Sequence, residues 1–522
     1  MIELLDCTLR DGGHVVNGQF GKKVIEGIAN SLIESGVDIL EMGFLWQEES
    51  SDDYARFHSI AELKKILPSR VNGTKISLMA DNVDLGNLEV NDGTVEFIRL
   101  SFRKNEMEWA EKQAKILKNK GYKVFFNPIH GSSISDEEYI EFIKRINKIH
   151  PYGFSIVDTF GALKHEDLTR LYYILDNNLS EDISIGIHLH ANLGLAFSLM
   201  HHLLQIASPK RHIIIDASLL GMGKVPGNLC MEQAMKCMND EYDRGYSLEA
   251  VYDAIDQYIS PIRDRIPWGY SLPYAISAQC KVHRTYAEYL FCKERLKTKD
   301  IKRLMEKIDF EHAEIFDEKY IEKIYNEYMN VSVDDENTLT ELKNILHNYK
   351  RVIVVAPGKT IKHMNSQLII GKDVCLISVN FVYNSINDSF VFATNTKRLH
   401  NINLNRKNII ITSNLLNENI NSKFVINRND LVYHKEHYCE DSTLMLINLL
   451  YKIGITNIEI AGFDGFIDGQ DNFYRNDYEH ILRDKTYSSK KIKRILDEVY
   501  CGMHMKFITP SIYEDTKIEN EK

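Results

Sequence analysis

Along residues 1–220, short β-branched runs alternate with amphipathic stretches. Apolar residues that recur every three or four positions predict helices, and compact apolar runs predict buried strands. The predicted strands are Ile2–Asp6, Val37–Phe44, Lys75–Ala80, Val95–Phe102, Tyr122–Asn127, Gly153–Asp158, Ser184–His190 and His212–Ser218. The predicted helices are Lys22–Ser35, Trp109–Lys120, Asp136–Ile149, His165–Asn177, Ala196–Ile206 and Asn228–Met238.

This alternation predicts a parallel sheet built from βα units. Eight such units within residues 1–245 match the size of a (β/α)8 barrel. A doubly wound open sheet is the alternative, and eight regular units in a row would make it a large one. We therefore predict an α/β protein with an N-terminal TIM barrel over residues 1–245.

The remaining residues predict two further parts. Residues 246–348 are helical in pattern, and we expect them to cover the barrel mouth and to link the barrel to a second domain. Residues 349–522 predict a Rossmann-like α/β domain, in which the helix Ser442–Tyr451 precedes the last predicted strand. Its strands are predicted at Arg351–Ala356, Val374–Val379, Phe390–Ala393, Asn408–Thr412, Phe424–Ile426 and Ile458–Gly462.

Composition narrows the class of protein. The 522 residues carry 63 basic and 74 acidic side chains, a net charge of −11, which argues against a nucleic-acid coat because phosphate neutralisation needs a basic face. No apolar run approaches the ~18 residues of a membrane span. The N-terminus lacks the pattern of a signal peptide, and the eight Cys form no CxxC pair. We expect a cytoplasmic protein with reduced thiols.

Polar residues gather where the predicted strands end. The active site of a TIM barrel lies at the carboxyl ends of its strands. The first strand leads into a polar turn, Asp6–His14, and Glu41 ends the second. Thr159 follows the sixth strand, and a glycine-rich loop with Gly221 and Gly223 follows the eighth. We expect Thr159, Gly221 and Gly223 to contact substrate.

His188 and His190 give the sharpest local signal. Residues i and i+2 of a strand point to the same side, so one strand would deliver two imidazoles to one point. Together with a carboxylate from another strand end, they predict a metal site with open positions. The mixed nitrogen and oxygen ligands favour Mn²⁺, with Mg²⁺ or Co²⁺ as alternatives. Without a metal, the pair would be two hydrogen-bonded histidines at a barrel mouth.

Arg10, Asp11 and His14 form the second signal. Gly12 and Gly13 follow Asp11 and allow a close turn, so that an ion and a guanidinium can approach one ligand. Such a pair suits an enolate or carboxylate oxygen, because fixed positive charge lies where negative charge develops. His14 titrates near neutral pH and is a candidate general base. An ordinary Arg–Asp ion pair and a surface-loop histidine are the alternatives.

Four ordered motifs carry a family resemblance: LLDCTLRDGGHVVNGQF, LEMGF, IHLHANLGLA and GMGKVPGN. They resemble the DRE-TIM metallolyase superfamily of 3-hydroxy-3-methylglutaryl-CoA lyases, isopropylmalate and homocitrate synthases, and 4-hydroxy-2-oxovalerate aldolases. The resemblance covers residues 1 to about 290. It implies a divalent metal held by Asp11, His188 and His190, with Asn228 as a further contact. It also implies that Arg10 stabilises an enolate and that Glu41 lies near the metal.

The residues after Arg10-Asp11 indicate the branch. Claisen-type synthases usually carry Glu-Gln after Arg-Asp-Gly, whereas Gly13 and His14 stand here, as in the pyruvate aldolases. In those aldolases the histidine is the base on the substrate hydroxyl. They also use a tyrosine from the region after the barrel, which is either Tyr270 or Tyr274 in this sequence. Cys230 lies beyond Asn228 and does not match the catalytic cysteine of the CoA lyases.

The resemblance therefore implies class II aldol chemistry. A 4-hydroxy-2-oxoacid would be cleaved to pyruvate and an aldehyde, or formed from them, through an enolate on the metal. The alternatives are an acyl-CoA-dependent Claisen synthase and a non-catalytic barrel that serves as a scaffold. Family barrels are usually oligomers, so a homo-oligomer is expected. The C-terminal region departs from that of the aldolases, so the resemblance does not extend to an oxovalerate substrate or to a dehydrogenase partner.

The second domain offers one local motif. The strand at Arg351 is followed by a loop with Gly358, Lys359 and Thr360, whose backbone N–H groups are predicted to bind phosphate. An ordinary βα turn is the alternative, because the loop matches neither GxGxxG nor a Walker sequence. Residues 351–475 faintly resemble domains related to bacterial sialyltransferases. That resemblance implies a nucleotide-sugar ligand.

Overall fold

The structure is a computed structural model of the chain. It describes residues 1–69, 71–129, 135–224, 226–364, 371–383, 388–434, 438–467, 472–473 and 485–514. Contacts divide the chain into two compact units. One contains Met1–Arg284 and Phe310–Ile315, and the other contains Thr285–Asp309 and Phe316–Lys522. None of the described helices combines the length and apolarity that a membrane crossing requires.

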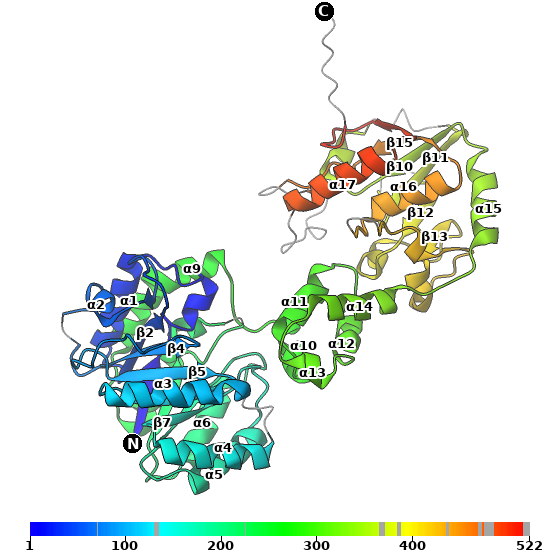
Figure 1. Cartoon of the computed structure of the whole chain (residues 1–522). Helices are drawn as coiled ribbons and strands as arrows, with labels where there is room; N and C mark the ends of the chain where they lie inside the picture. The colour runs from blue at the N-terminus through cyan, green and yellow to red at the C-terminus, as the bar shows by residue number, and fades with distance from the viewer. Residues whose placement is uncertain are drawn as a thin grey trace, which may run out of the picture. The chain divides into compact units, whose positions relative to one another are not determined.

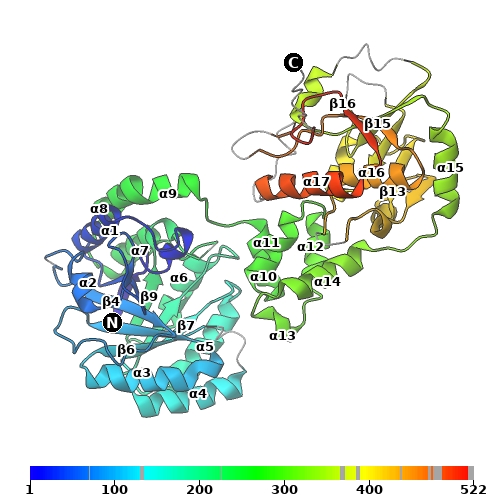
Figure 2. The same ribbon diagram turned by 45° about the horizontal axis from the view of Figure 1, so that its top comes forward.

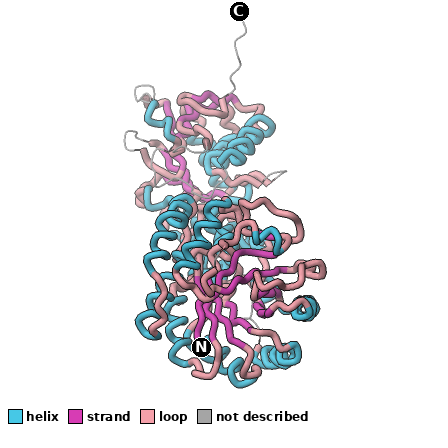
Figure 3. The backbone as a smooth tube through the Cα atoms, turned by 90° about the vertical axis from the view of Figure 1, so that its left-hand side faces the viewer, coloured by secondary structure: helices cyan, strands magenta, loops and turns pink. Residues whose placement is uncertain are grey.

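Eight parallel strands of the first unit close into a barrel (Figures 1 and 3). The order is β1-β9-β8-β7-β6-β5-β4-β2, and the pairing of β1 with β2 closes the ring. A short strand, β3 (Arg56–Phe57), pairs with β2. The predicted TIM barrel is confirmed, with strands β1 Ile2–Asp6, β2 Ile39–Leu45, β4 Lys75–Asp81, β5 Phe97–Phe102, β6 Lys123–Pro128, β7 Gly153–Val157, β8 Ser184–His188 and β9 Ile213–Ala217.

Helices lie outside the strands, as Figure 2 shows for α3, α4 and α5. In α4, Tyr139, Phe142, Ile143 and Ile146 are buried, which is the spacing of one helix face. The helix begins after Ser135, whose hydroxyl accepts the Glu138 N–H while the Glu138 carboxylate accepts the Ser135 N–H. The helices are α1 Lys22–Glu34, α2 Ile60–Lys64, α3 Met107–Asn119, α4 Asp136–Ile149, α5 His165–Asn178, α6 Ala196–Ile206 and α7 Met231–Tyr242.

The barrel interior changes character along its axis. The rings of Phe97, Phe125 and Tyr152 pack together with centroids 5.1 to 5.5 Å apart and fill the end nearer the strand N-termini. Two residues further along β5, the guanidinium of Arg99 is buried in the same interior and contacts Asp216 of β9. Barrel interiors are usually filled by Val, Ile and Leu. Here an aromatic floor supports a layer of buried charges.

Residues 246–348 are helical, as the pattern predicted. The helices are α8 Leu248–Ala254, α9 Ser260–Arg265, α10 Leu272–Cys280, α11 Arg284–Cys292, α12 Thr298–Met305, α13 Phe310–Ala313, α14 Glu318–Met329 and α15 Glu336–Leu346. A π-helical turn, Ile255–Ile259, joins α8 to α9. The helices up to Arg284 belong to the barrel unit. The boundaries at 245 and 348 remain predictions.

The second unit contains a separate parallel sheet of order β14-β13-β12-β11-β10-β15-β16. Six of these strands match predicted ones: β10 Arg351–Val355, β11 Val374–Val379, β12 Phe390–Ala393, β13 Ile409–Thr412, β14 Phe424–Ile426 and β15 Asn457–Ala461. The edge strand β16 (His504–Phe507) and the helix α17 (Lys485–Val499) were not predicted. The helix α16 (Ser442–Lys452) starts where Asp441 accepts the N–H groups of Thr443 and Leu444.

The aromatic floor yields a stability prediction. A Cβ at Gly153 would lie 2.1 Å from Cε1 of Phe125, so Gly153→Ala forces the ring to move within a packed interior. We expect a loss of roughly 1–3 kcal/mol in the free energy of unfolding, measured by denaturant titration. Gly86→Ala is the matched control, because its Cβ would meet only the Asp84 carboxylate at 3.4 Å. Equal stability of the two variants would contradict the prediction.

Candidate metal centre at the barrel mouth

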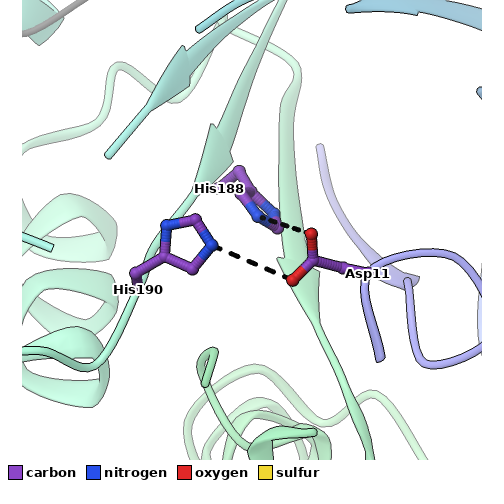
Figure 4. A group of neighbouring side chains, drawn as sticks. All are labelled: Asp11, His188 and His190. Carbon is purple, nitrogen blue, oxygen red and sulfur yellow. Dashed lines mark ion pairs between the residues drawn. The ribbon is translucent and has the colours of Figure 1, made fainter. Parts of the chain in front are cut away.

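Asp11, His188 and His190 meet at the carboxyl ends of the barrel strands (Figure 4). Asp11 lies in the turn after β1, His188 ends β8, and His190 follows two residues later. His188 Nε2 is 3.9 Å from Asp11 Oδ1, and His190 Nε2 is 3.8 Å from Asp11 Oδ2. All three side chains are buried, and their ligand atoms lie within 4.8 Å of one another. The arrangement is a group that could hold a metal ion.

His190 lies outside the strand on which it was predicted, because β8 ends at His188. It forms an isolated antiparallel bridge with Asn228 instead. The two imidazoles stand nearly perpendicular, at 87°, with centroids 4.9 Å apart. They converge because the bridge to the glycine-rich loop holds His190 in place.

A second layer of contacts orients both imidazoles. His188 Nδ1 lies 3.0 Å from Asp216 Oδ2, and His190 Nδ1 lies 2.7 Å from the carbonyl oxygen of Asp158. Such bonds place the proton on Nδ1 and leave Nε2 as the electron-pair donor. The carboxylate of Asp158 itself accepts the N–H groups of Ala162 and Leu163, and burial raises its pKa to about 6. Asp158 therefore shapes the turn after β7.

Asn228 joins the group through a hydrogen bond. Its Nδ2 donates to Asp11 Oδ2 at 2.9 Å. A Cβ at Gly223 would lie 2.4 Å from that Nδ2, and Gly221 has φ +62° with its Cβ position 2.8 Å from the Asn228 carbonyl oxygen. The two glycines thus give the loop room to bring Asn228 close. The predicted contact of Gly221 and Gly223 with substrate stays a prediction.

Buried ion pairs connect the group to the barrel interior. Arg10 donates from Nη1 to Asp11 Oδ1 at 2.6 Å and from Nε to Glu41 Oε2 at 2.7 Å. Glu41 also faces Arg99 Nη1 at 3.3 Å. Burial alone would raise the pKa of Asp11, but Arg10 and the two imidazoles outweigh it and hold that pKa well below its usual value. The carboxylate of Asp11 is therefore ionised.

His14 lies beside the group, at its solvent side. Its Nε2 is 4.0 Å from Asp11 Oδ1, and its side chain is 45% exposed. The ring packs edge-on against Phe44, with centroids 5.8 Å apart. Desolvation outweighs the attraction of Asp11 and lowers the pKa of His14 to about 4. The imidazole is therefore neutral at pH 7 with a free electron pair, and its pKa is lower than the near-neutral value that the sequence predicted.

A small pocket of about 30 Å³ opens beside His190. The predicted Thr159 lines it, together with Lys224 and side chains of the region after the barrel. Those side chains are Ser277, Val282, His283 and Arg284. Neither predicted tyrosine lines this pocket: Tyr270 is 64% exposed, and Tyr274 is partly buried on α10. Their catalytic role stays a prediction.

Four residues of this region were missed by the sequence analysis. Arg99 and Asp216 lie within apolar strand runs, where the alternation of β5 and β9 could have marked them as inward-facing. Lys224 lies inside the glycine-rich motif, and its N–H donates to Asp11 Oδ2 at 3.1 Å. Arg284 follows α10, and no local pattern indicates that it reaches the pocket.

The predicted phosphate loop of the second unit has its N–H groups engaged. Gly358 N–H donates to the Gly462 carbonyl at 2.7 Å, and Lys359 N–H donates to the Asn472 carbonyl at 3.2 Å. Thr360 N–H donates to Asp464 Oδ2 at 2.7 Å, and its hydroxyl bonds the other carboxylate oxygen. Protein acceptors therefore occupy the three N–H groups that a phosphate would need.

Three known proteins are similar to the part of the chain that forms the barrel. The 4-hydroxy-2-oxovalerate aldolase of Geobacillus genomosp. 3 is 24% identical over 279 residues, which cover 50% of this chain and 78% of that protein. The cytosolic homocitrate synthase isozyme of Saccharomyces cerevisiae is 24% identical over 276 residues, 51% of this chain and 63% of that protein. The solved HMG-CoA lyase of Brucella melitensis has a TM-score of 0.40 at 13% identity, with 50% of this chain and 98% of that chain covered.

The family model described as HMGL-like matches residues 1–257. That match confirms the resemblance drawn from the four sequence motifs. Residues 1–257 of this chain are an HMGL-like (DRE-TIM) domain.

Proposed function

We propose that the barrel is a metal-dependent aldolase that cleaves or forms a 4-hydroxy-2-oxoacid from pyruvate and an aldehyde. The observation that carries this function is the buried Asp11–His188–His190 group, with Arg10 and His14 beside it. Relatives named 4-hydroxy-2-oxovalerate aldolase support the aldolase branch. The proposal rests on the residues at the barrel mouth and not on the second unit.

The residues present fit a divalent metal. His190 Nε2 and Asn228 Oδ1 are buried and have no hydrogen-bond partner among the described residues. Both atoms are electron-pair donors beside the ionised Asp11, so Asp11, His188 and His190 would hold the ion and Asn228 would assist. The mixed nitrogen and oxygen set favours Mn²⁺, with Mg²⁺ or Co²⁺ as alternatives. When bound, the ion would supply Lewis-acid stabilisation of negative charge on the oxygens of a 2-oxoacid.

Arg10 is placed to stabilise the enolate oxygen. Its guanidinium lies between Glu41 and Asp11, which fix its orientation by hydrogen bonds of 2.7 and 2.6 Å. Because the side chain is only 6% exposed, its charge acts with little screening by water. A preorganised cation of this kind stabilises negative charge that develops during the reaction without having to move. Glu41 acts as a positioning residue for Arg10.

His14 is placed to take the proton of the C4 hydroxyl. It is neutral at pH 7 and partly open to solvent, beside the buried group. Loss of that proton allows the C3–C4 bond to break, with the carbonyl of the aldehyde forming at C4 and the electron pair passing to the enolate of pyruvate. Lys224 and Arg284 add positive charge to the adjoining pocket, which suits the substrate carboxylate. Thr159 lines the same pocket and would contact the substrate there.

A Claisen synthase is the second candidate, because a homocitrate synthase is also similar to the barrel. Such an enzyme would form the enolate on acetyl-CoA and release a thiol. His14 supports the aldolase, because Gly13 and His14 stand where the synthases usually carry Glu-Gln. The two candidates differ in their enolate donor, which makes the donor the property to measure first.

Solvent deuterium exchange into the methyl group of pyruvate tests the proposed function. We expect exchange with Mn²⁺ or Mg²⁺, none with EDTA, and none in His188→Ala, read by mass spectrometry. His150→Ala is the matched control, because His150 pairs with Asp182 at the surface. An absence of exchange with every metal, together with thiol release from acetyl-CoA, would replace the aldolase by the synthase.

Arg10→Ala tests the stabilising charge. We expect the exchange rate to fall by roughly 10²–10³, as on removal of one oxyanion donor. Metal affinity, measured by calorimetry, should not weaken, because the lost group is a cation next to Asp11. Arg56→Ala is the control, since that guanidinium lies over the Trp46 ring. Exchange at the wild-type rate in Arg10→Ala would refute the assigned role.

His14→Ala separates the two halves of the reaction. We expect cleavage of a 4-hydroxy-2-oxoacid to slow by roughly 10²–10⁴, the usual contribution of a general base. Deuterium exchange into pyruvate should persist, because pyruvate has no C4 hydroxyl. Coupled lactate dehydrogenase measures the first rate and mass spectrometry the second. An equal loss in both rates would show that His14 does not act on the hydroxyl.

A further inference from the structure

The sheet of the second unit has a switch point beside its central strand. From β10 the chain proceeds outward through β11, β12, β13 and β14, and it then returns to β15 on the other side of β10 (Figure 1). In open parallel sheets, ligands bind outside the carboxyl ends of the strands at such a point. A cleft of about 270 Å³ lies there. Residues that follow β10, β11, β12 and β15 line it: Pro357, Gly358, Asn380, Asn395 and Gly462.

Positive charge exceeds negative charge at one side of this cleft. The carboxylate of Glu440 accepts hydrogen bonds from the fully buried Arg428 and from the Tyr325 hydroxyl. Arg295 Nε lies 3.5 Å from the same carboxylate. One carboxylate therefore stands against two guanidinium groups. A buried excess of charge is costly unless a counter-ion neutralises it.

Within the described residues, the guanidinium of Arg295 makes only long contacts. Its side chain is 9% exposed, and its Nη atoms lie 3.4 Å from the hydroxyls of Thr394 and Ser442. Hydrogen bonds from guanidinium groups to their partners are usually nearer to ~2.9 Å. The guanidinium thus lines the cleft with capacity for a closer, charged acceptor.

Lys293 adds a second cation to the same side. Its ammonium lies over the rings of Tyr289, Tyr325 and Tyr438, at 4.6, 5.1 and 5.6 Å from their centroids. Within the described residues, no carboxylate oxygen lies within 4.0 Å of it. These rings hold the ammonium in place without neutralising it. Lys293 and Arg295 together suit an acceptor with two negative charges.

The other carboxylates of the cleft are already engaged. Glu294 pairs with Lys397 at 3.0 Å, and Asp441 accepts the first N–H groups of α16. Asp464 accepts the hydroxyl and the N–H of Thr360. Hydrogen bonds to neutral groups do not remove the charges of Asp441 and Asp464, but within the described residues neither carboxylate forms an ion pair with Lys293 or Arg295. Arg398 and Lys491 are further cations of the lining.

Aromatic rings complete the lining. Phe463 and Phe466 follow β15, and Phe473 and Tyr513 join them. Phe466 and Phe473 meet edge to face with centroids 5.9 Å apart, and Phe463 and Tyr513 pack at 4.8 Å. Aromatic side chains offer stacking surfaces to a flat base, and a few charged groups fix its phosphate. An inorganic anion would leave this apolar part of the lining without a contact.

We propose that this cleft binds a nucleotide, with its phosphate on Lys293 and Arg295 and its base against Phe463 and Phe466. The site uses side chains in place of the loop N–H groups, which Gly462, Asn472 and Asp464 already occupy. The inference is independent of the aldolase function proposed for the barrel.

Calorimetry on the full chain tests the site. The probes are the mono- and diphosphates of cytidine, uridine, guanosine and adenosine, with inorganic phosphate, pyrophosphate and the free nucleosides alongside. We expect at least one nucleotide to bind more tightly than any of the latter. Lys293→Gln and Arg295→Gln should each weaken that binding by about tenfold or more, because a charge-assisted contact is lost.

Lys297→Gln is the matched control. Lys297 lies on the same segment, pairs with Glu418, and is not among the residues that line the cleft. Its binding constant should equal that of the wild type. Because Arg295 is buried, Lys293→Gln, at a partly exposed position, carries the test if Arg295→Gln does not fold.

Three results would overturn the proposal: no nucleotide binding at about 1 mM, equal affinity in Lys293→Gln and Lys297→Gln, or binding of pyrophosphate as tight as that of any nucleotide. Deuterium exchange into pyruvate, measured on the same preparation, tests the aldolase function by itself. A failure of nucleotide binding is therefore distinguishable from a failure of the proposed aldolase.

Discussion

The barrel depends on one buried guanidinium, that of Arg99. It is 1% exposed and lies 2.5 Å from Asp216 and 3.3 Å from Glu41. Each of these carboxylates also contacts a residue of the candidate site: Asp216 orients His188, and Glu41 orients Arg10. Without Arg99, two buried carboxylates would face each other in a medium of low dielectric constant, at a cost of about 3–5 kcal/mol for an uncompensated charge.

The charges around Arg99 also decide what the site attracts. Two guanidinium groups, of Arg10 and Arg99, face three carboxylates, of Asp11, Glu41 and Asp216. Burial would raise the pKa of Asp216, but Arg99 and His188 outweigh it and lower that pKa. One negative charge remains in excess beside two imidazoles whose Nε2 atoms face Asp11. A site with excess negative charge favours a cation. The ion pairs that stabilise the barrel are therefore the same ones that support its proposed chemistry.

Both sheets gather polar groups at the carboxyl ends of their strands, but they do so by different means. In the barrel, the turns after β1 and β8 supply the side chains directly. In the second sheet, the loops after β10 and β15 bind each other through Thr360 and Asp464. The two cations proposed to bind the ligand, Lys293 and Arg295, lie outside the strand-end loops. Because these loops satisfy their own N–H groups, recognition of the proposed nucleotide would fall to neighbouring segments.

The amino-acid sequence by itself predicted most of the strands and helices, and its motifs named Asp11, His188 and His190 as candidate metal ligands. Periodicity reports local burial, so it predicted β1, α4 and β12 at their observed residues. It did not predict that Arg99 meets Asp216, 117 positions away, because that pairing exists only once the barrel has closed. It also put His190 on a strand, whereas a bridge to Asn228 sets its place. Contacts between distant segments depend on the packing of the whole barrel, and local patterns carry no record of them.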